Sequence, residues 1–361
     1  MQRELPDCGI GAGIIELSHR DKDGPVQSTV RRAAENIKTL LEVPDTHEVL
    51  LMHGGAHGQF AAIPLNLLGA KSKGAYVDGG VWSQRAMSEG AKYCDPVVAA
   101  SAKGSGYKSY PPVSEWNIPD DCAFIHCCAN ETIEGLEFHE DPDVGSKAVL
   151  VADFTSSLLS RKVDISKYGI VYASSGKNLG PSGVCVVIVR KDLMGKHKSE
   201  TPSILTYSAL AGLDYNPILG KNQAPNLYNT PNTFACRMVE LVTDDIISKG
   251  GMEVVEKQVN RRSTTLYKII DESDGFYVNN VDKTWRSRVT IIFNIAPSLP
   301  ENGGKLLEEK FVAEALLAGF QQLFGHPISG GLRVCLYNGV PEESFQALMN
   351  FMRSFMKSNK K

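Results

Sequence analysis

Long hydrophobic runs, an apolar signal core in the opening residues and an excess of charge are all missing from this sequence. No apolar stretch reaches the length that crosses a bilayer, and the opening residues, MQRELPDCGIGAG, contain no apolar signal core. The net charge is only −3, so the strongly basic surface that nucleic acid requires is missing too. We therefore expect a cytoplasmic protein whose partner is neither a membrane nor a nucleic acid.

Paired cysteines are missing as well. None of the eight cysteines forms a C-x-x-C pair, the spacing that zinc sites usually show, and so we predict no metal site. Several lie in apolar, strand-like runs, which indicates reduced and mostly buried thiols. The eight are Cys8, Cys94, Cys122, Cys127, Cys128, Cys185, Cys236 and Cys335.

The first two-thirds of the chain alternate short apolar runs with helix-like stretches. This alternation indicates an α/β fold with a mainly parallel central sheet covered on both faces. The 361 residues suggest two domains, which we place at residues 1–235 and 236–361, the second a smaller α+β domain. The expected strands of the first domain are Glu48–Met52, Ala75–Val77, Ala123–Cys127, Ala148–Ala152, Gly169–Ala173 and Val184–Val189.

A lysine stands in a glycine-rich turn, ASSGKNLGPSG, between two strands that we expect to be antiparallel. Lys177 could be an ordinary solvated turn lysine. A phosphate-binding P-loop does not fit, because Val171 stands where the first glycine of that motif belongs and Asn178 follows the lysine. A lysine in a partly dry pocket at a strand end can instead form a Schiff base with an aldehyde.

Other strand ends carry candidate site residues. Asp153 follows an apolar strand, where open α/β sheets bind ligands, although such an aspartate can also be a helix N-cap. HGGAHG, from His53 to Gly58, could bind an anion at a helix start or be a plain strand–turn–helix. Trp82 could stack on a cofactor or belong to the core, and Thr132 lies at a further strand end.

Together, the lysine, the aspartate, the glycine loop and the tryptophan resemble the working set of a fold-type I pyridoxal-phosphate enzyme. Eight motifs, in order along the chain, resemble the phosphoserine aminotransferase family of class V aminotransferases. They are HGGAHGQFAAIPLNLL, YVDGGVWS, NETIEG, ADFTSSLLSRKVD, SSGKNLGPSGVCVVIVR, PSILTYS, YNTPNTFA and GLRVCLYN.

The resemblance implies a role for each candidate residue. Lys177 would form the Schiff base with pyridoxal 5'-phosphate and carry the α-proton, and Asp153 would bind the pyridine nitrogen. Trp82 would stack on the ring, and Thr132 would bind its phenolic oxygen. The remaining cofactor contacts would go to the phosphate and come from Ala56, His57, Gly176 and, from a neighbouring subunit, Asn229 and Thr230.

The resemblance also implies substrate contacts. Arg333 would bind the α-carboxylate through its planar fork. His19 and Arg20, again from the neighbour, would bind the phosphate or side-chain carboxylate together with His326. Arg20 could otherwise be a surface ion-pair residue, and His326 an ordinary loop or core histidine.

The sequence departs from the family pattern near the expected phosphate sites. His57 stands where the family usually has arginine, and Pro327 stands where it usually has a basic residue. Gly176 replaces a glutamine, and the family's Ser-Gly-Pro opening segment is absent.

The implied reaction is a ping-pong transamination between glutamate and 3-phosphohydroxypyruvate in serine biosynthesis, catalysed by a homodimer with shared sites. The departures leave open an aminotransferase for a non-phosphorylated 2-oxo acid. A cofactor-free Schiff-base aldolase and a nucleotide-binding module remain as alternatives of another class.

Overall fold

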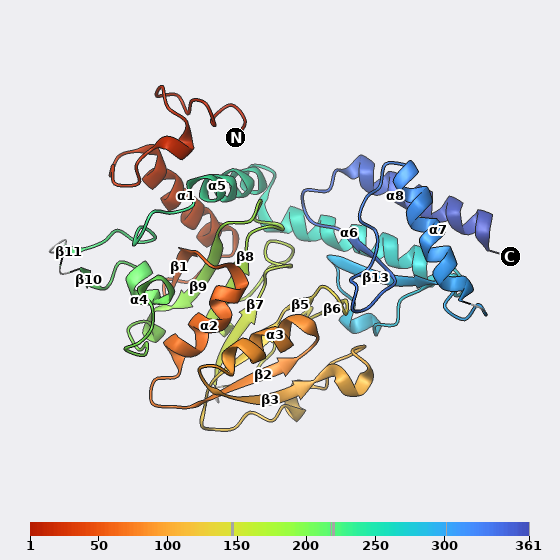
Figure 1. Cartoon of the computed structure of the whole chain (residues 1–361), viewed down its shortest axis with the longest axis horizontal. Helices are drawn as coiled ribbons and strands as arrows, with labels where there is room; N and C mark the ends of the chain where they lie inside the picture. The colour runs from red at the N-terminus through yellow and green to blue at the C-terminus, as the bar shows by residue number, and fades with distance from the viewer. Residues whose placement is uncertain (146–147, 217, 219–220, 301, 361) are drawn as a thin grey trace.

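The chain folds into a large α/β layer structure and a smaller sheet-and-helix unit beside it, as the computed structural model in Figure 1 shows. The structure describes residues 1–145, 148–216, 218, 221–300 and 302–360. In its described part, no helix combines the length and the apolar character that a membrane span needs.

A seven-stranded sheet forms the centre of the large unit. Its strand order is β1-β9-β8-β7-β4-β2-β3. The strands run parallel except β9, which is antiparallel to both of its neighbours. The strands are β1 (His47–Met52), β2 (Lys73–Asp78), β3 (Asp95–Ser101), β4 (Cys122–Cys128), β7 (Val149–Asp153), β8 (Ile170–Ser174) and β9 (Cys185–Arg190).

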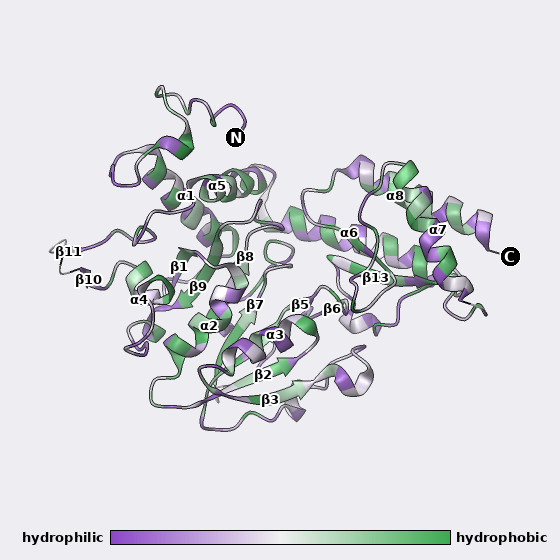
Figure 2. Ribbon diagram, in the orientation of Figure 1, coloured by the Kyte–Doolittle hydropathy of each residue, from purple (hydrophilic) through white to green (hydrophobic). Residues whose placement is uncertain are grey.

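Apolar residues on both faces of these strands explain why the sheet is buried between helices. In β1, Val49 and Leu51 join the core that includes α1 (Pro25–Leu40) and α5 (Thr233–Ser248). Leu50 and Met52 point to the opposite face and join the core that includes α2 (Gly55–Leu67). α3 (Val81–Gly90) and α4 (Tyr207–Leu210) contribute to this second core. Figure 2 shows the hydrophobic residues concentrated along these central strands.

The smaller unit packs three helices on a three-stranded antiparallel sheet of order β12-β13-β14. Its core contains the fully buried Phe311, Phe345 and Met352, which come from two of those helices. Its elements are α6 (Gly251–Asp271), β12 (Tyr277–Val278), β13 (Thr290–Ile295), α7 (Gly303–Leu317), β14 (Leu332–Cys335) and α8 (Glu342–Asn359).

The mainly parallel sheet, the antiparallel turn pair β8–β9 and the six expected strands are confirmed. The sequence interpretation missed β3 and the short hairpins β5 (Asn130–Glu131)–β6 (Leu136–Glu137) and β10 (Tyr215–Asn216)–β11 (Lys221–Asn222). The domain boundary between residues 235 and 236 stays a prediction; α5 runs across it and packs on α1 in the large core.

Candidate active site

A cavity of about 280 Å³ lies at the carboxyl ends of the central parallel strands. Strands β4, β7 and β8 each deliver a residue to its wall: Cys128, Asp153 and Ser174. These ends meet at one edge of the sheet, which is where open α/β sheets bind ligands. The wall consists of Gly54, Gly55, Ala56, His57, Trp82, Cys128, Asn130, Thr132, Asp153, Thr155, Ser156, Ser174, Ser175, Gly176 and Lys177.

Lys177 projects from the tight turn between β8 and β9. Gly176 adopts φ +111°, a backbone conformation that favours glycine, and its N–H donates to the carbonyl of Gly180 at 2.6 Å. The lysine Nζ lies 6.0 Å from the centroid of the Trp82 ring. The turn therefore places a half-buried amine in the cavity and opposite an aromatic ring.

Asp153 is a buried carboxylate with a hydrogen-bonded support behind it. Its Oδ1 accepts the Thr155 N–H at 2.7 Å, so it caps a turn and not a helix. The Tyr172 side chain also favours its charged form, and the His126 Nε2 lies 2.8 Å from the Tyr172 hydroxyl. Burial raises the pKa of Asp153 and lowers the pKa of His126 to about 3, so His126 is neutral at physiological pH. This support makes the carboxylate suited to a cationic ring nitrogen.

The start of α2 gives the cavity an anion site. Gly54 and Gly55 both have positive φ, +89° and +60°, which turns the chain from β1 directly into the helix. The first helical hydrogen bond runs from the Gly58 N–H to the Gly54 carbonyl. The N–H groups of residues 55–57 therefore have no acceptor within the helix. Together with the helix dipole, they favour a phosphate group there.

The opposite side of the cavity holds an aromatic platform connected to the small unit. The Trp82 indole Nε1 donates to the Thr132 Oγ1 at 2.9 Å. The Thr132 carbonyl accepts from the Arg333 Nη1 at 3.2 Å. Because Arg333 belongs to β14, a cation of the small unit reaches the rim of this cavity.

The structure brings most of the predicted site residues together. Ala56, His57, Trp82, Thr132, Asp153, Gly176 and Lys177 line the cavity, and Arg333 contacts Thr132.

Five predicted residues do not line the cavity of their own chain. Arg20 and Thr230 are exposed, and His19 and Asn229 are partly so. His326 accepts the Ile328 N–H at its Nδ1, at 3.3 Å.

Sequence reasoning missed a set of hydroxyl and amide side chains in the cavity wall. The Thr155 Oγ1 accepts the Ser174 N–H at 3.1 Å, which connects the ends of β7 and β8. The repeated Ser and Thr directly after two strands, DFTSS and ASSG, are the signal that could have found them. The missed residues are Asn130, Thr155, Ser156, Ser174 and Ser175.

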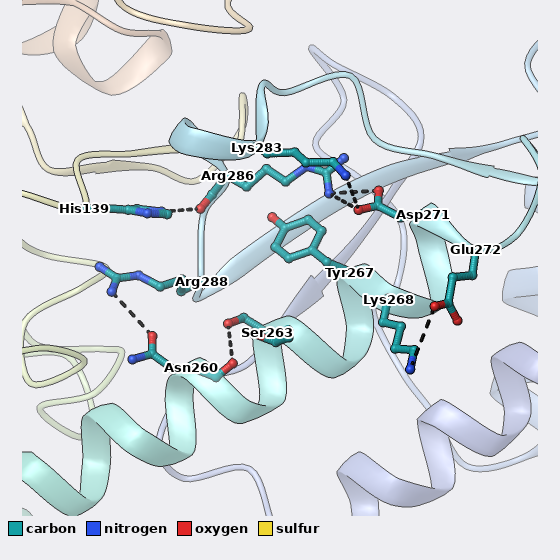
Figure 3. Close-up of a pocket in the computed structure, with 11 residues that line it drawn as sticks. His139, Asn260, Ser263, Tyr267, Lys268, Asp271, Glu272, Lys283, Arg286 and Arg288 are labelled. Carbon is teal, nitrogen blue, oxygen red and sulfur yellow. Dashed lines mark hydrogen bonds and ion pairs between the residues drawn. The ribbon is translucent and has the colours of Figure 1, made fainter.

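A larger cavity, about 720 Å³, lies between α6 and residues 283–288 (Figure 3). Most of its charged groups pair with one another: Arg286 and Lys283 with Asp271 at 2.9 and 3.4 Å, and Lys268 with Glu272 at 3.8 Å. Such mutual pairing is typical of structural contacts. Among the described residues, no group of three or more His, Cys, Asp or Glu side chains is placed to hold a metal ion.

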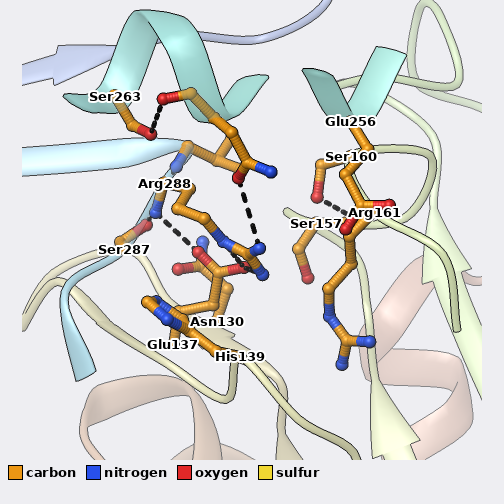
Figure 4. Close-up of polar contacts among 12 residues, drawn as sticks. Asn130, Glu137, His139, Ser157, Ser160, Arg161, Glu256, Ser263, Ser287 and Arg288 are labelled. Atoms are coloured by element: carbon orange, nitrogen blue, oxygen red, sulfur yellow. Dashed lines mark hydrogen bonds and ion pairs between the residues drawn. The ribbon is translucent and has the colours of Figure 1, made fainter. Parts of the chain in front are cut away.

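The segment that carries Thr132 continues into a polar contact with the small unit (Figure 4). The Asn130 Nδ2 donates to the Ser156 Oγ at 2.8 Å and to the Thr290 Oγ1 at 3.3 Å. Glu137 stands seven residues after Asn130, and its Oε1 lies 2.6 Å from the Arg288 Nη2. The cavity wall and the small unit are therefore held together on both sides of Thr132.

These groups fit one kind of cofactor. An amine, a buried carboxylate, an aromatic platform and a helix N-terminus in one cavity match an aldehyde, a pyridine nitrogen, a flat ring and a phosphate. The match rests on residues that this structure places within one wall.

Comparisons with known proteins agree with this geometry. The family model described as aminotransferase class-V matches residues 16–348. The structure of phosphoserine aminotransferase from Bacillus circulans subsp. alkalophilus is similar, with 38% identity, 99% of this chain and 93% of that chain covered, and a TM-score of 0.89. A phosphoserine aminotransferase studied for radiation damage of its Schiff base shares 35% identity over 99% of this chain and 94% of that one, with a TM-score of 0.90. The PLP-bound enzyme from Trichomonas vaginalis shares 30% identity over 98% and 94%, with a TM-score of 0.84.

Proposed function

The chain belongs to the class V aminotransferases, and on that premise we propose that it is a phosphoserine aminotransferase that uses pyridoxal 5'-phosphate. The observation that carries the proposal is the cavity that unites Lys177, Asp153, Trp82 and the start of α2. Its support is 35–38% identity to phosphoserine aminotransferases over 99% of the chain.

The bound cofactor supplies an aldehyde that takes up amino groups and a conjugated ring that withdraws electrons from the substrate's α-carbon. The chain supplies the rest. Asp153 would hold a positive charge on the ring nitrogen, and the N–H groups of Ala56 and His57 would bind the phosphate. Lys177, whose amine lies in the same cavity, would hold the cofactor at its aldehyde end and would move the proton of the substrate's α-carbon.

Substrate recognition rests on Arg333 and on cations near the cavity mouth. Arg333 is half-buried, and its planar guanidinium suits the α-carboxylate that glutamate and phosphoserine share. His326, in the loop before β14, and the lent His19 and Arg20 would bind the group that distinguishes the two substrates, with 3-phosphohydroxypyruvate as the acceptor.

A second copy of the chain completes the site in this proposal. His19, Arg20, Asn229 and Thr230 lie outside the cavity of their own chain and are available to a neighbour. The nearby segment before and within the β10–β11 hairpin exposes Leu213 and Tyr215 at 57% and 64%. Exposed apolar side chains of this kind are typical of a protein–protein contact, and we propose a homodimer.

A cytoplasmic location fits the state of the cysteines. All eight are free thiols, and six of them are buried. Thiols of this kind persist in a reducing compartment.

A direct test is to add pyridoxal 5'-phosphate to the purified protein and record the visible absorbance band of the bound cofactor. Phosphoserine and 2-oxoglutarate should then give glutamate, with phosphoserine preferred to serine and alanine by at least about tenfold in kcat/KM, or about 1.4 kcal/mol.

The matched controls are two lysine variants. Lys177→Ala should lose turnover, because the amine that binds the cofactor and moves the proton is gone. Lys167→Ala should keep it, because Lys167 is exposed and lies outside the cavity wall. Equal use of phosphoserine and serine would favour an aminotransferase for a non-phosphorylated oxo acid; a protein without the visible band would contradict the proposal.

A further inference from the structure

The start of α3, which carries Trp82, is capped in an unusual way. A helix begins with N–H groups that have no helical acceptor, and the residue before the helix commonly caps them with its side chain. Here that residue is Gly80, which has no side chain. The first bond within the helix runs from the Gln84 N–H to the Gly80 carbonyl at 3.0 Å.

Two glutamates from a distant segment accept the free N–H groups instead. The Glu134 Oε1 accepts the Val81 N–H at 3.0 Å. The Glu131 carboxylate accepts two: the Trp82 N–H on Oε2 at 3.1 Å and the Ser83 N–H on Oε1 at 2.8 Å. Glu131 therefore uses both oxygens, whereas the Glu134 Oε2 accepts from no donor in the described part of the chain.

The two carboxyls are buried close together and keep a proton between them. Burial raises the pKa of both carboxyls well above the usual value, and repulsion from Glu134 adds to the rise at Glu131. Two such groups lose their protons in two steps, and the apparent pKa of each step belongs to the pair and not to one residue. The hydrogen bonds decide where the charge lies: on Glu131, whose two oxygens both accept, with the proton on Glu134.

The space around the pair is tight. A Cβ added to Gly80 would overlap the Glu134 carboxyl. Glycine before α3 is therefore required by close approach, and the capping groups must come from elsewhere in the chain.

The same short segment also holds the indole. Thr132 lies between the two glutamates and accepts the Trp82 Nε1–H at 2.9 Å. Trp82 is thus held by its backbone N–H through Glu131 and by its ring N–H through Thr132. The ring lines the cavity, with the Lys177 Nζ 6.0 Å from its centroid.

We propose that Glu131 is a positioning residue for the reaction: by accepting the Trp82 and Ser83 N–H groups it fixes the indole over the cofactor cavity, while Glu134 contributes a single replaceable bond. The inference rests on the proposed function in one respect, namely that the cavity beside the Trp82 indole binds the ring of pyridoxal 5'-phosphate.

Glutamine variants distinguish the two glutamates. Glu131→Gln keeps the shape but has one acceptor for two N–H groups, and its amide NH₂ must face one of them. Glu134→Gln keeps its single acceptor on Val81. We expect Glu131→Gln to weaken the binding of pyridoxal 5'-phosphate about tenfold, since an unsatisfied buried donor is costly. We expect less than about a twofold change for Glu134→Gln.

A double-mutant cycle with Trp82→Phe separates positioning from general stability. If Glu131 acts through the indole, Glu131→Gln should add less than about twofold to the cofactor dissociation constant when Trp82 is already phenylalanine. An equal tenfold loss in both backgrounds would overturn the proposal. If Glu131→Gln does not fold, Glu131→Asp replaces it in the cycle, because aspartate keeps the charge but withdraws both oxygens by one methylene.

A second readout needs neither cofactor nor substrate. In the cofactor-free protein, Glu131→Gln should speed hydrogen exchange at the Trp82 and Ser83 amides, and Glu134→Gln should not. Unchanged exchange at these two amides would also overturn the proposal. A wild-type protein that binds the cofactor but does not use phosphoserine would contradict the proposed substrate and leave this cycle intact.

Discussion

At the scale of single residues, the cavity combines side chains from strand ends with side chains that are held by distant parts of the chain. Asp153 and Lys177 belong to the first kind: they stand at or just after the ends of apolar strands, and the sequence predicts both. The second kind could not be predicted in this way. Glu131 caps a helix that begins fifty positions earlier, and Tyr172 supports Asp153 from a neighbouring strand. Local sequence carries no signal for such contacts, because they depend on the register of the sheet.

The glutamate pair at α3 predicts a pH dependence of stability. Glutamates titrate near pH 4.5 when unfolded, and here burial raises the pKa values of the Glu131–Glu134 pair to between about 7 and 8. The folded state therefore binds more protons than the unfolded state between these limits. The free energy of unfolding must fall as pH rises, by up to roughly 1.4 kcal/mol per pH unit for each extra proton.

Urea unfolding of the cofactor-free protein between about pH 6 and 8 measures this slope. Asp78 adds repulsion to Glu134, while the nearby Tyr107, Tyr110 and Cys128 have raised pKa values and stay neutral over this range. Glu134→Gln removes one of the two titrating groups, so its slope should be shallower. A slope equal to that of the wild type would show that the pair does not hold the extra proton.

At the scale of elements, periodicity predicted the long helices and the buried strands, because each has a continuous apolar face or run. It failed for β3, whose residues Asp95 to Val98 are mostly exposed at the sheet edge. Helix α2 begins at Gly55, within the glycine-rich segment HGGAHG. Glycines usually indicate a turn, and only the positive φ of Gly54 and Gly55 lets the helix begin inside the glycine run.

One contact between elements should contribute strongly to stability. Glu137, at the end of β6, is 1% exposed in its side chain and pairs with Arg288, which is 15% exposed. It also accepts the Arg288 backbone N–H at 2.6 Å. Glu137→Ala would leave a largely buried guanidinium and a part-buried N–H without their acceptor. We expect a loss of about 3–5 kcal/mol in the free energy of unfolding.

The matched control for this variant is an exposed ion pair on α6. Lys268 and Glu272 are 68% and 66% exposed, so Glu272→Ala should cost less than about 1 kcal/mol in the same urea titration. If the two alanine variants unfold at the same urea concentration, the contact between β6 and Arg288 is not an important link.

At the scale of the whole molecule, the family resemblance indicated which residues belong to a neighbour's site, and local sequence patterns could not indicate this. Eight of the predicted residues meet at one cavity or contact its wall within a single chain. Five lie elsewhere, and four of these, His19, Arg20, Asn229 and Thr230, are the ones that the resemblance assigns to a neighbouring subunit. A strand pattern or a helix period describes one chain, and so it cannot indicate which residues a second copy lends.

Mixing two inactive variants tests the assembly and these assignments together. If the proposed homodimer is correct, Lys177→Ala should disable the chain that holds the cofactor and Arg20→Ala the chain that lends the arginine, so each variant alone should be nearly inactive. When the two are refolded in equal amounts, random pairing makes half of the dimers mixed, and each mixed dimer has one site with both defects and one with none. Activity should therefore recover to about a quarter of the wild-type value, because a two-fold dimer has two shared sites. A site built within one chain leaves every site with one defect after mixing, so an absence of recovery, once a tag has shown that subunits exchange, would refute the shared site.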